Sequence, residues 1–520
     1  MSLVRTVARN IVSNWVALGV TTLVGFFMTP FLISRLGSDI YGLWIFIGSF
    51  SGFFGLVDFG LRSSVSRYVA YYMGRDDMDG ARDTLASSFH VLSIFSLCVC
   101  VVAGAVSILL PWIVPEQELT RQVQPALFLV GCSMAVGFMT SPYGATLIAA
   151  QRFDLLRMVD ILRTFLRVAL VVTAVLLGGR LLALAAVQLT LTALSYFAFS
   201  KLAHRYAPFS RIRGGSYSRS ILRTLYGYGI WNFVIRNADH MLQVVVNALI
   251  LNFLGSAAYI TFLSLAHRLV RYAQEVSSEA SGVLLPVLSQ LDGREVIGGQ
   301  RVVFMTTTRL FSMICIPLAL SMILLGRPLI AAWVDEAHAA QAFPLLLITM
   351  LSYVPTALAM PASSLILGKA RNRILGFLSV GCFAASVSTI ILIHAVAQLS
   401  LAHVALALSV PRAIGQGIIV PRYAVRISGG RYRTYLLQAI LPGILAGAPQ
   451  ATFLIAYTHF FTVSSLIEVL IVGALGASVY GITGWFVVLD RNWRERVIHV
   501  IAGYIRLIKR APHSEGADNE

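Results

Sequence analysis

Charged side chains inside apolar stretches are the residues of this chain best suited to chemistry. Two neighbouring stretches hold most of them, and their members are Arg236, Asp239, Arg268, Arg271, Glu275 and Glu279. An ionisable group at membrane depth costs at least about 2.5–3.5 kcal/mol, so each group requires a partner or a water-filled cavity. A guanidinium group fits the oxygens of a phosphate, whereas a buried carboxylate can carry a proton or a cation. The pattern therefore predicts contact with an anionic ligand, together with candidate sites for a coupling ion.

Two of these arginines lie at matching depths. At 1.5 Å per residue, Arg236 and Arg268 are each about 11 residues from a span end and therefore about 16 Å deep, near the membrane midplane. Together they predict an anion clamp, with Arg271 one turn after Arg268 as a further binding residue. Internal pairing is the alternative, because Arg271 and Glu275 are four residues apart and Arg236 and Asp239 are three apart.

An earlier apolar stretch contains Asp58, Arg62 and Arg67. Asp58 and Arg62 are one helical turn apart and can neutralise each other. Arg62 lies about 31 Å from the predicted outer end of its span, so its guanidinium can instead reach the cytoplasmic headgroups. We expect Arg62 and Arg67 to line the cytoplasmic mouth of a cavity. The candidate ion-coupling carboxylates of the whole chain are Asp58, Asp239, Glu275 and Glu279.

Apolar stretches long enough to cross a bilayer run through nearly the whole sequence. The chain has 520 residues, of which 57% are hydrophobic and 12% are charged, whereas soluble proteins carry about 25% charged residues. A spanning helix needs about 20 apolar residues, so the stretches predict about 14 transmembrane helices in an all-α, polytopic membrane protein. Their expected ranges are 10–34, 41–66, 84–110, 123–149, 158–178, 181–201, 225–253, 257–286, 303–325, 341–367, 374–394, 399–421, 435–458 and 465–489.

The 40 lysine and arginine residues orient these spans. Short basic loops stay on the cytoplasmic side of a membrane, and this side receives most of the basic residues when the N-terminus is placed inside. Both termini are therefore predicted to be cytoplasmic. The net charge of +17 then reflects the cytoplasmic loops, and no nucleic-acid partner is expected.

The two halves of the chain share a short pattern. Leu36-Gly37-Ser38-x-x-Tyr41 recurs as Leu254-Gly255-Ser256-x-x-Tyr259. We predict two parallel six-helix repeats followed by two additional helices, an arrangement in which two lobes rock around a site between them. The predicted divisions are an N-terminal lobe (1–201), a basic cytoplasmic linker (202–224), a C-terminal lobe (225–424), two further spans (425–490) and a cytoplasmic tail (491–520).

Sequence motifs for enzymatic chemistry are absent. The chain contains no P-loop, G-x-S-x-G or H-E-x-x-H pattern. Its five cysteines lie in apolar spans without metal-ligand spacing. No cofactor, metal or catalytic residue is expected. An enzyme such as a membrane glycan polymerase is an alternative, but its outer acid–base residues would be sparse and unpaired: Glu116, Glu118, Asp335 and Glu336.

Motifs in the first part of the chain carry a family resemblance. They are Asn14, Pro30, Leu36-Gly37, Tyr41-Gly42-Leu43-Trp44, Leu56-x-Asp58-Phe59-Gly60-Leu61, Arg67-Tyr68-Val69-Ala70 and Leu147-Ile148-x-Ala150-x-Arg152-Phe153. With them the chain resembles the polysaccharide flippase family, within the superfamily that also contains lipid II flippases and multidrug extruders. The resemblance implies two six-helix lobes around a V-shaped cavity, which the first, second, seventh and eighth helices line.

The resemblance also implies a substrate. The diphosphate of an undecaprenyl-linked glycan is held by cavity arginines, here Arg62, Arg67, Arg236 and Arg268, and the lipid tail lies in a groove beside the last two helices. Some relatives carry arginines within the first helix, whereas this span is uncharged between Arg9 and Arg35.

The predicted function is that of a membrane transporter in the cell inner membrane. It flips a polyprenyl-diphosphate-linked oligosaccharide from the cytoplasmic to the outer leaflet, for the biosynthesis of a surface polysaccharide such as lipopolysaccharide. Membrane lipids, a polysaccharide polymerase and glycosyltransferases are the expected partners. A multidrug or cation antiporter on the same fold is the first alternative. Its cationic substrate would favour an acidic cavity, whereas the predicted midplane charges of this chain are mostly basic. The glycan polymerase is the second alternative.

Overall fold

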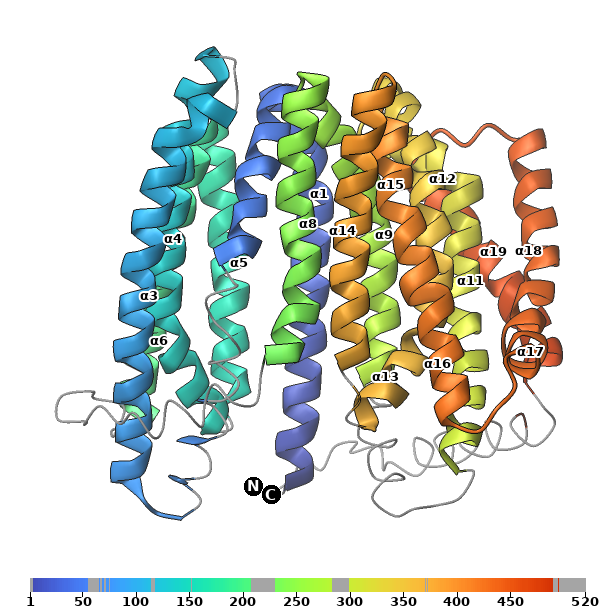
Figure 1. Cartoon of the computed structure of the whole chain (residues 1–520), viewed down its shortest axis with the longest axis horizontal. Coiled ribbons are helices and arrows are strands. Elements are labelled where there is room, and N and C mark those ends of the chain that lie inside the picture. The colour runs from blue at the N-terminus through green and yellow to red at the C-terminus, as the bar shows by residue number, and fades with distance from the viewer. Residues whose placement is uncertain are drawn as a thin grey trace, which may run out of the picture. The chain divides into compact units, whose positions relative to one another are not determined.

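The chain is built from α-helices. The computed structural model describes residues 3–54, 65, 68–69, 72–73, 75–113, 117–150, 152–206, 230–282, 299–369, 371, 373–489 and 494. Within these ranges every regular element is an α-helix or a short π-helix (Figure 1). Ten helical stretches of the described residues are long and apolar enough to cross a membrane. The predicted class, an all-α, polytopic membrane protein, is confirmed.

Three predicted spans correspond to helices outside those ten. They are α5 (Phe153–Leu176), α8 (Ile230–Leu254) and α9 (Ala258–Gly282). The sequences of all three contain charged residues, and such residues within a membrane require partners inside the protein or a wet cavity. These three helices are therefore the candidates for a functional site.

The described residues fall into two compact units. The first consists of Met1–Arg268, Trp333–Thr349 and Asn372–Pro411, and the second consists of Leu269–Ala332, Met350–Arg371 and Arg412–Glu520. The predicted division into two six-helix lobes stays a prediction.

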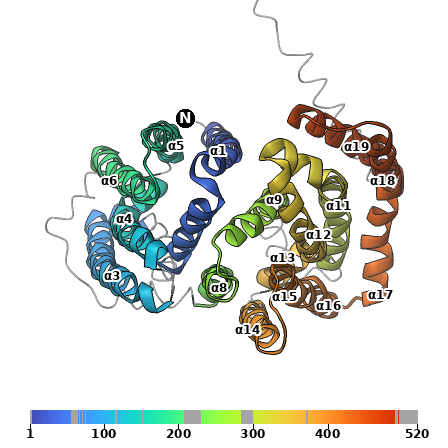
Figure 2. The same cartoon turned by 90° about the horizontal axis from the view of Figure 1, so that it is seen from above.

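In the first unit, three helices pack side by side: α3 (Met78–Ile113), α4 (Gln117–Ala149) and α6 (Leu181–Tyr206) (Figures 1 and 2). Buried Leu85 and Leu92 of α3 lie against Ala145 of α4. Leu147 of α4 lies against Phe199 of α6. Helix α14 (Arg373–Val396) packs along α8 in the same unit. Apolar side chains and small residues thus form its core, as is usual between membrane helices.

Helix α1 (Leu3–Phe54) contains the first predicted span and the described part of the second. The helical path is interrupted at Gly37, which has a φ of 79° and a ψ of 163°. Gly255, its counterpart in the repeated pattern, has a φ of 73°. Glycine adopts this left-handed region without the penalty that a Cβ atom imposes. Both copies of the Leu-Gly-Ser pattern therefore make a corner at the same residue.

The second unit contains the remaining helices. The elements that lie entirely within this unit are α13 (Met360–Gly368), π-helix η3 (Gly415–Ile419), α16 (Val420–Ile427), α17 (Tyr432–Tyr435), π-helix η4 (Leu436–Ile440), α18 (Leu441–Phe460) and α19 (Leu466–Val487). Helices α11 (Gly299–Trp333), α12 (Glu336–Leu358) and α15 (Leu401–Ile414) contribute parts to both units. The buried Tyr480 hydroxyl of α19 lies 3.1 Å from the Ser312 carbonyl and 3.0 Å from that of Gly443, which links α19 to α11 and α18.

Candidate functional site

The structure describes only part of the predicted site. Asp58, Arg62 and Arg67 lie outside the described residues, and their predicted roles stay predictions. Arg236 lies on α8 and Glu279 lies on α9, but their side chains are also outside the described part.

Three further predicted residues are described and remain untested as site residues. Asp239 is exposed on α8, Arg271 is exposed on α9, and Glu275 is partly buried one turn after Arg271. Each makes polar contacts in the structure. Their binding or coupling roles stay predictions.

Arg268 is the predicted binding residue whose environment is best defined. It lies on α9 and is partly buried. Its Nη1 donates to the Gly25 carbonyl at 3.3 Å and to the hydroxyl of Thr29. Both acceptors belong to α1 and both are uncharged. Among the described residues no carboxylate forms an ion pair with Arg268, and the two groups that hold its guanidinium are uncharged.

The proline of α1 explains a second contact beside this arginine. Pro30 has no N–H group, so the Phe26 carbonyl cannot accept the usual helical hydrogen bond from position 30. The indole Nε1 of Trp333 donates to this carbonyl at 2.8 Å. The Trp333 ring also stacks on the Phe26 ring at a centroid distance of 4.7 Å. Trp333 therefore satisfies the carbonyl that Pro30 leaves open and packs beside the segment that holds Arg268.

The repeated Leu-Gly-Ser corners contact each other within the first unit. The Asp39 carboxylate accepts hydrogen bonds from the Ser256 hydroxyl at 3.2 Å and from the backbone N–H of Ala258 at 3.0 Å. The Thr261 hydroxyl donates to the Ser38 carbonyl at 2.6 Å. Asp39 of α1 thus caps the first turn of α9, where free N–H groups favour a negative charge.

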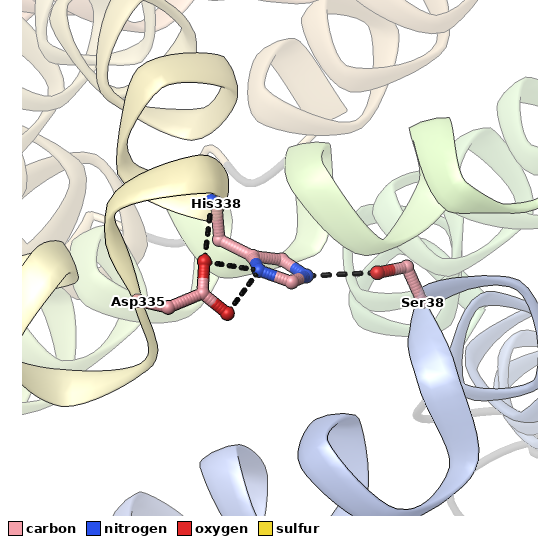
Figure 3. Close-up of polar contacts among 3 residues, drawn as sticks. All are labelled: Ser38, Asp335 and His338. Carbon is pink, nitrogen blue, oxygen red and sulfur yellow. Dashed lines mark hydrogen bonds and ion pairs between the residues drawn. The ribbon is translucent and has the colours of Figure 1, made fainter.

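A serine, a histidine and an aspartate extend these contacts (Figure 3). The Ser38 hydroxyl lies 2.8 Å from His338 Nε2, and His338 Nδ1 lies 2.8 Å from both carboxylate oxygens of Asp335. With its proton on Nδ1, the ring donates to Asp335 and accepts from Ser38. We call Ser38, Asp39, Ser256, Thr261, Asp335 and His338 the corner seam. The sequence-based view that Asp335 is unpaired was wrong, because Asp335 directly precedes α12 and its partner His338 is three residues away in the first turn of that helix.

The environment of Asp335 shifts its ionisation. Burial opposes the charged form, but the hydrogen bonds from the backbone N–H and the ring of His338 outweigh it and hold the pKa of Asp335 below its ordinary value. A carboxyl group with a depressed pKa stabilises the fold above the pKa of the unfolded chain. That stabilisation is lost as the pH falls through the folded-state pKa.

Asp335→Asn is therefore expected to weaken the corner seam in a pH-dependent way. Because Asp335 is half exposed, the loss in free energy of unfolding near neutral pH is only about 0.5–1 kcal/mol. The difference from the parent protein should disappear at a pH below the folded-state pKa of Asp335, where the parent carboxyl is protonated as well. Denaturation in detergent at the two pH values measures this. An equal difference at both would show that the charge of Asp335 has no part in the effect.

The chain is similar to one described protein family and to solved structures of membrane transporters. A family model described as "Polysaccharide biosynthesis protein" matches residues 69–342, just over half of the chain. A comparison with curated proteins gave no match. The lipid II flippase MurJ, in an inward closed conformation, is similar with a TM-score of 0.71 at 14% identity, over 92% of this chain and 98% of MurJ.

Multidrug transporters share the fold as well. An inward-facing multidrug resistance MATE family transporter of the MOP superfamily has a TM-score of 0.65 at 15% identity, over 78% of this chain and 98% of that transporter. A MOP superfamily transporter from Pyrococcus furiosus, described by the reverse polarity of its binding pocket, has a TM-score of 0.60 at 14% identity, over 82% of this chain and 95% of its own. At these identities the similarity shows the fold alone.

Proposed function

This chain belongs to the polysaccharide biosynthesis protein family and has the fold of MOP-superfamily transporters, and we propose that it flips a polyprenyl-diphosphate-linked oligosaccharide. The substrate moves from the cytoplasmic to the outer leaflet of the inner membrane, and both termini are cytoplasmic. Its head group passes through the protein while its prenyl chain stays in lipid. Glycosyltransferases supply the substrate, and a polymerase consumes it in the assembly of a surface polysaccharide.

The observation that carries this proposal is the charge of Arg268. Its guanidinium is fixed by the Gly25 carbonyl and the Thr29 hydroxyl, and no described carboxylate neutralises it. A fixed, uncompensated guanidinium on a membrane helix is suited to an anionic group such as a diphosphate. Membership of a polysaccharide biosynthesis family supplies the glycan part of the proposed substrate.

The remaining predicted residues complete the proposal. Arg236 and Arg271 act with Arg268 on the diphosphate, and Arg62 and Arg67 receive it at the cytoplasmic mouth. The two lobes rock around the bound head group, as in other transporters with parallel repeats. A proton or cation moving through Asp58, Asp239, Glu275 or Glu279 supplies the driving force.

A multidrug antiporter is the first competing function, because MATE transporters share the fold. The MATE transporter compared above is a multidrug resistance transporter, and a cationic drug requires a carboxylate rather than a guanidinium at its site. An enzyme is the second, because Ser38, His338 and Asp335 have the order of hydroxyl, imidazole and carboxylate found in serine hydrolases.

Flipping in proteoliposomes tests the proposal against both competitors. The purified protein should accelerate the transfer of a fluorescent polyprenyl-diphosphate oligosaccharide between leaflets, measured with a membrane-impermeant quencher. The same vesicles should show no gradient-driven uptake of a cationic dye. They should also show no extension or hydrolysis of the glycan, the reactions that Ser38→Ala would abolish in an enzyme. Dye transport without flipping would favour the antiporter, and chemical change of the glycan would favour the enzyme.

A further inference from the structure

Helix α5 carries more positive charge than its own carboxylates balance. Asp154 pairs with Arg152 at 3.1 Å, and Asp160 pairs with Arg157 at 3.1 Å. Arg163 and Arg167 follow on the same helix. In the described part of the chain, neither of these two arginines forms an ion pair.

Arg163 has a hydrogen-bonding group that is both buried and unused. Its Nη2 donates to the Thr192 hydroxyl of α6 at 3.2 Å, and this hydroxyl also lies 2.9 Å from the Ser133 hydroxyl of α4. Thr192 in turn donates to the Gln188 carbonyl at 2.9 Å. The Nε group of Arg163 is buried and has no hydrogen-bond partner. A buried donor without an acceptor is costly, and more so when it carries charge.

Arg167 is accessible on the side of α5 that faces away from its exposed apolar stripe. Met158, Leu162 and Phe165 are 54%, 65% and 56% exposed and recur every three to four residues, as expected for a lipid-facing stripe. At about 100° per residue, Arg167 is rotated by roughly 140° from Leu162 and 180° from Met158. Its side chain is nevertheless exposed and forms no hydrogen bond with a described residue. Contact with acyl chains therefore does not explain its exposure.

Depth excludes an ordinary interfacial role for Arg167. Counted at 1.5 Å per residue from position 158, where the predicted span begins, Arg163 lies about 7.5 Å and Arg167 about 13.5 Å along the helix. Arg167 is therefore near the middle of a hydrocarbon core about 30 Å thick. An arginine side chain reaches only about 6–7 Å, too short to bring the Arg167 guanidinium to a headgroup layer. Arg163, one turn nearer the surface, interacts electrostatically with Asp160, whereas Arg167 at its depth requires an anion.

We propose that Arg163 and Arg167 form a second anion site, which binds a phosphate-bearing head group. Residues four apart on a helix are neighbours with Cβ atoms about 5–6 Å apart, so the two guanidinium groups can grip adjacent phosphate groups of one diphosphate. The Thr192 hydroxyl, which is itself hydrogen-bonded to the Ser133 hydroxyl, fixes the Arg163 end of the site. The ligand is either the diphosphate of the transported lipid or the headgroup of an anionic phospholipid. The first identification rests on the proposed function, whereas the existence of the site does not.

Binding measurements on the full-length protein in nanodiscs test this site. Farnesyl diphosphate is the probe for the lipid diphosphate, and phosphatidylglycerol in place of phosphatidylcholine is the probe for a phospholipid headgroup. Arg163→Gln with Arg167→Gln should lower the affinity for one of these probes by about 10-fold or more, because hydrogen bonds to charged groups are lost. Arg163→Lys with Arg167→Lys retains the charges and should retain part of the binding.

The matched control is Arg180→Gln, which removes an exposed arginine just beyond the end of α5 and should change neither affinity. Loss of farnesyl diphosphate binding alone supports a substrate site, and loss of phosphatidylglycerol binding alone supports a site for membrane phospholipid. Unchanged affinity for both probes in a correctly inserted double variant overturns the proposal. Flipping by the parent protein is measured separately. If the parent flips substrate but the double variant binds both probes normally, the second site is wrong and the proposed function stands.

Discussion

Arg268→Ala is expected to lower glycolipid export by about 10- to 150-fold, because a charged group that contacts the substrate loses its hydrogen bonds to it. The protein should still insert and fold. The substitution leaves no buried carbonyl without a donor, since the Thr29 hydroxyl also donates to Gly25 at 2.7 Å. Flipping in proteoliposomes, normalised to the amount of inserted protein, is the measurement.

Two companion variants separate the charge of Arg268 from its placement. Arg268→Lys keeps the charge but not the planar fork, so it should retain part of the activity. Thr29→Val keeps the arginine but removes one of its two supports on α1, and its defect should be smaller than that of alanine at 268. Arg121→Ala, at an exposed arginine of α4, is the charge-matched control. Unchanged flipping by well-inserted Arg268→Ala would remove Arg268 from the binding site.

The parts of the fold that depend on neighbouring residues could be predicted from the sequence. Apolar runs of spanning length identify membrane helices, and Gly37 and Gly255 mark corners because only glycine adopts their backbone conformation cheaply. The span predicted at 158–178 is present as α5 although it carries arginines. Charge lowers the hydropathy of a helix but does not prevent its formation, since membrane helices bury such groups within the protein.

The contacts of the candidate site were harder to predict from the sequence, because they join distant parts of the chain. The depth argument identified Arg268, but no pattern along the sequence connects it to Gly25 and Thr29. The same holds for Ser38 and His338, which are 300 residues apart. Pro30 offered the one usable signal: a proline inside a helix frees the carbonyl four residues earlier, and Trp333 occupies it. A free carbonyl predicts that a donor exists, but not which residue provides it.

Gly42→Ala is expected to destabilise the corner seam strongly, because α1 and the turn before α9 approach each other closely at this glycine. A Cβ atom at position 42 would lie 1.9 Å from the Ala257 carbonyl oxygen and 2.7 Å from its carbon. Both atoms belong to the backbone of the turn before α9, so no side-chain rotation relieves the overlap. Overpacking of this kind costs about 1–3 kcal/mol. The free energy of unfolding in detergent should fall by that amount, and the Ser256 region should become more accessible.

Gly48→Ala provides the matched control, because the same methyl group on the same helix meets no atom within 4 Å. It should leave stability unchanged or raise it by about 0.5–1 kcal/mol, since alanine favours a helix over glycine. Alkylation of the thiol in Ser256→Cys reports opening of the corner seam. If the cost of about 1–3 kcal/mol acts on this opening, labelling should increase about 5- to 150-fold in Gly42→Ala. Labelling should not increase in Gly48→Ala. Equal labelling in the two variants would mean that α1 and the turn before α9 do not approach as closely as Gly42 permits. The contacts of Asp39 and Thr261 would then hold the seam without it.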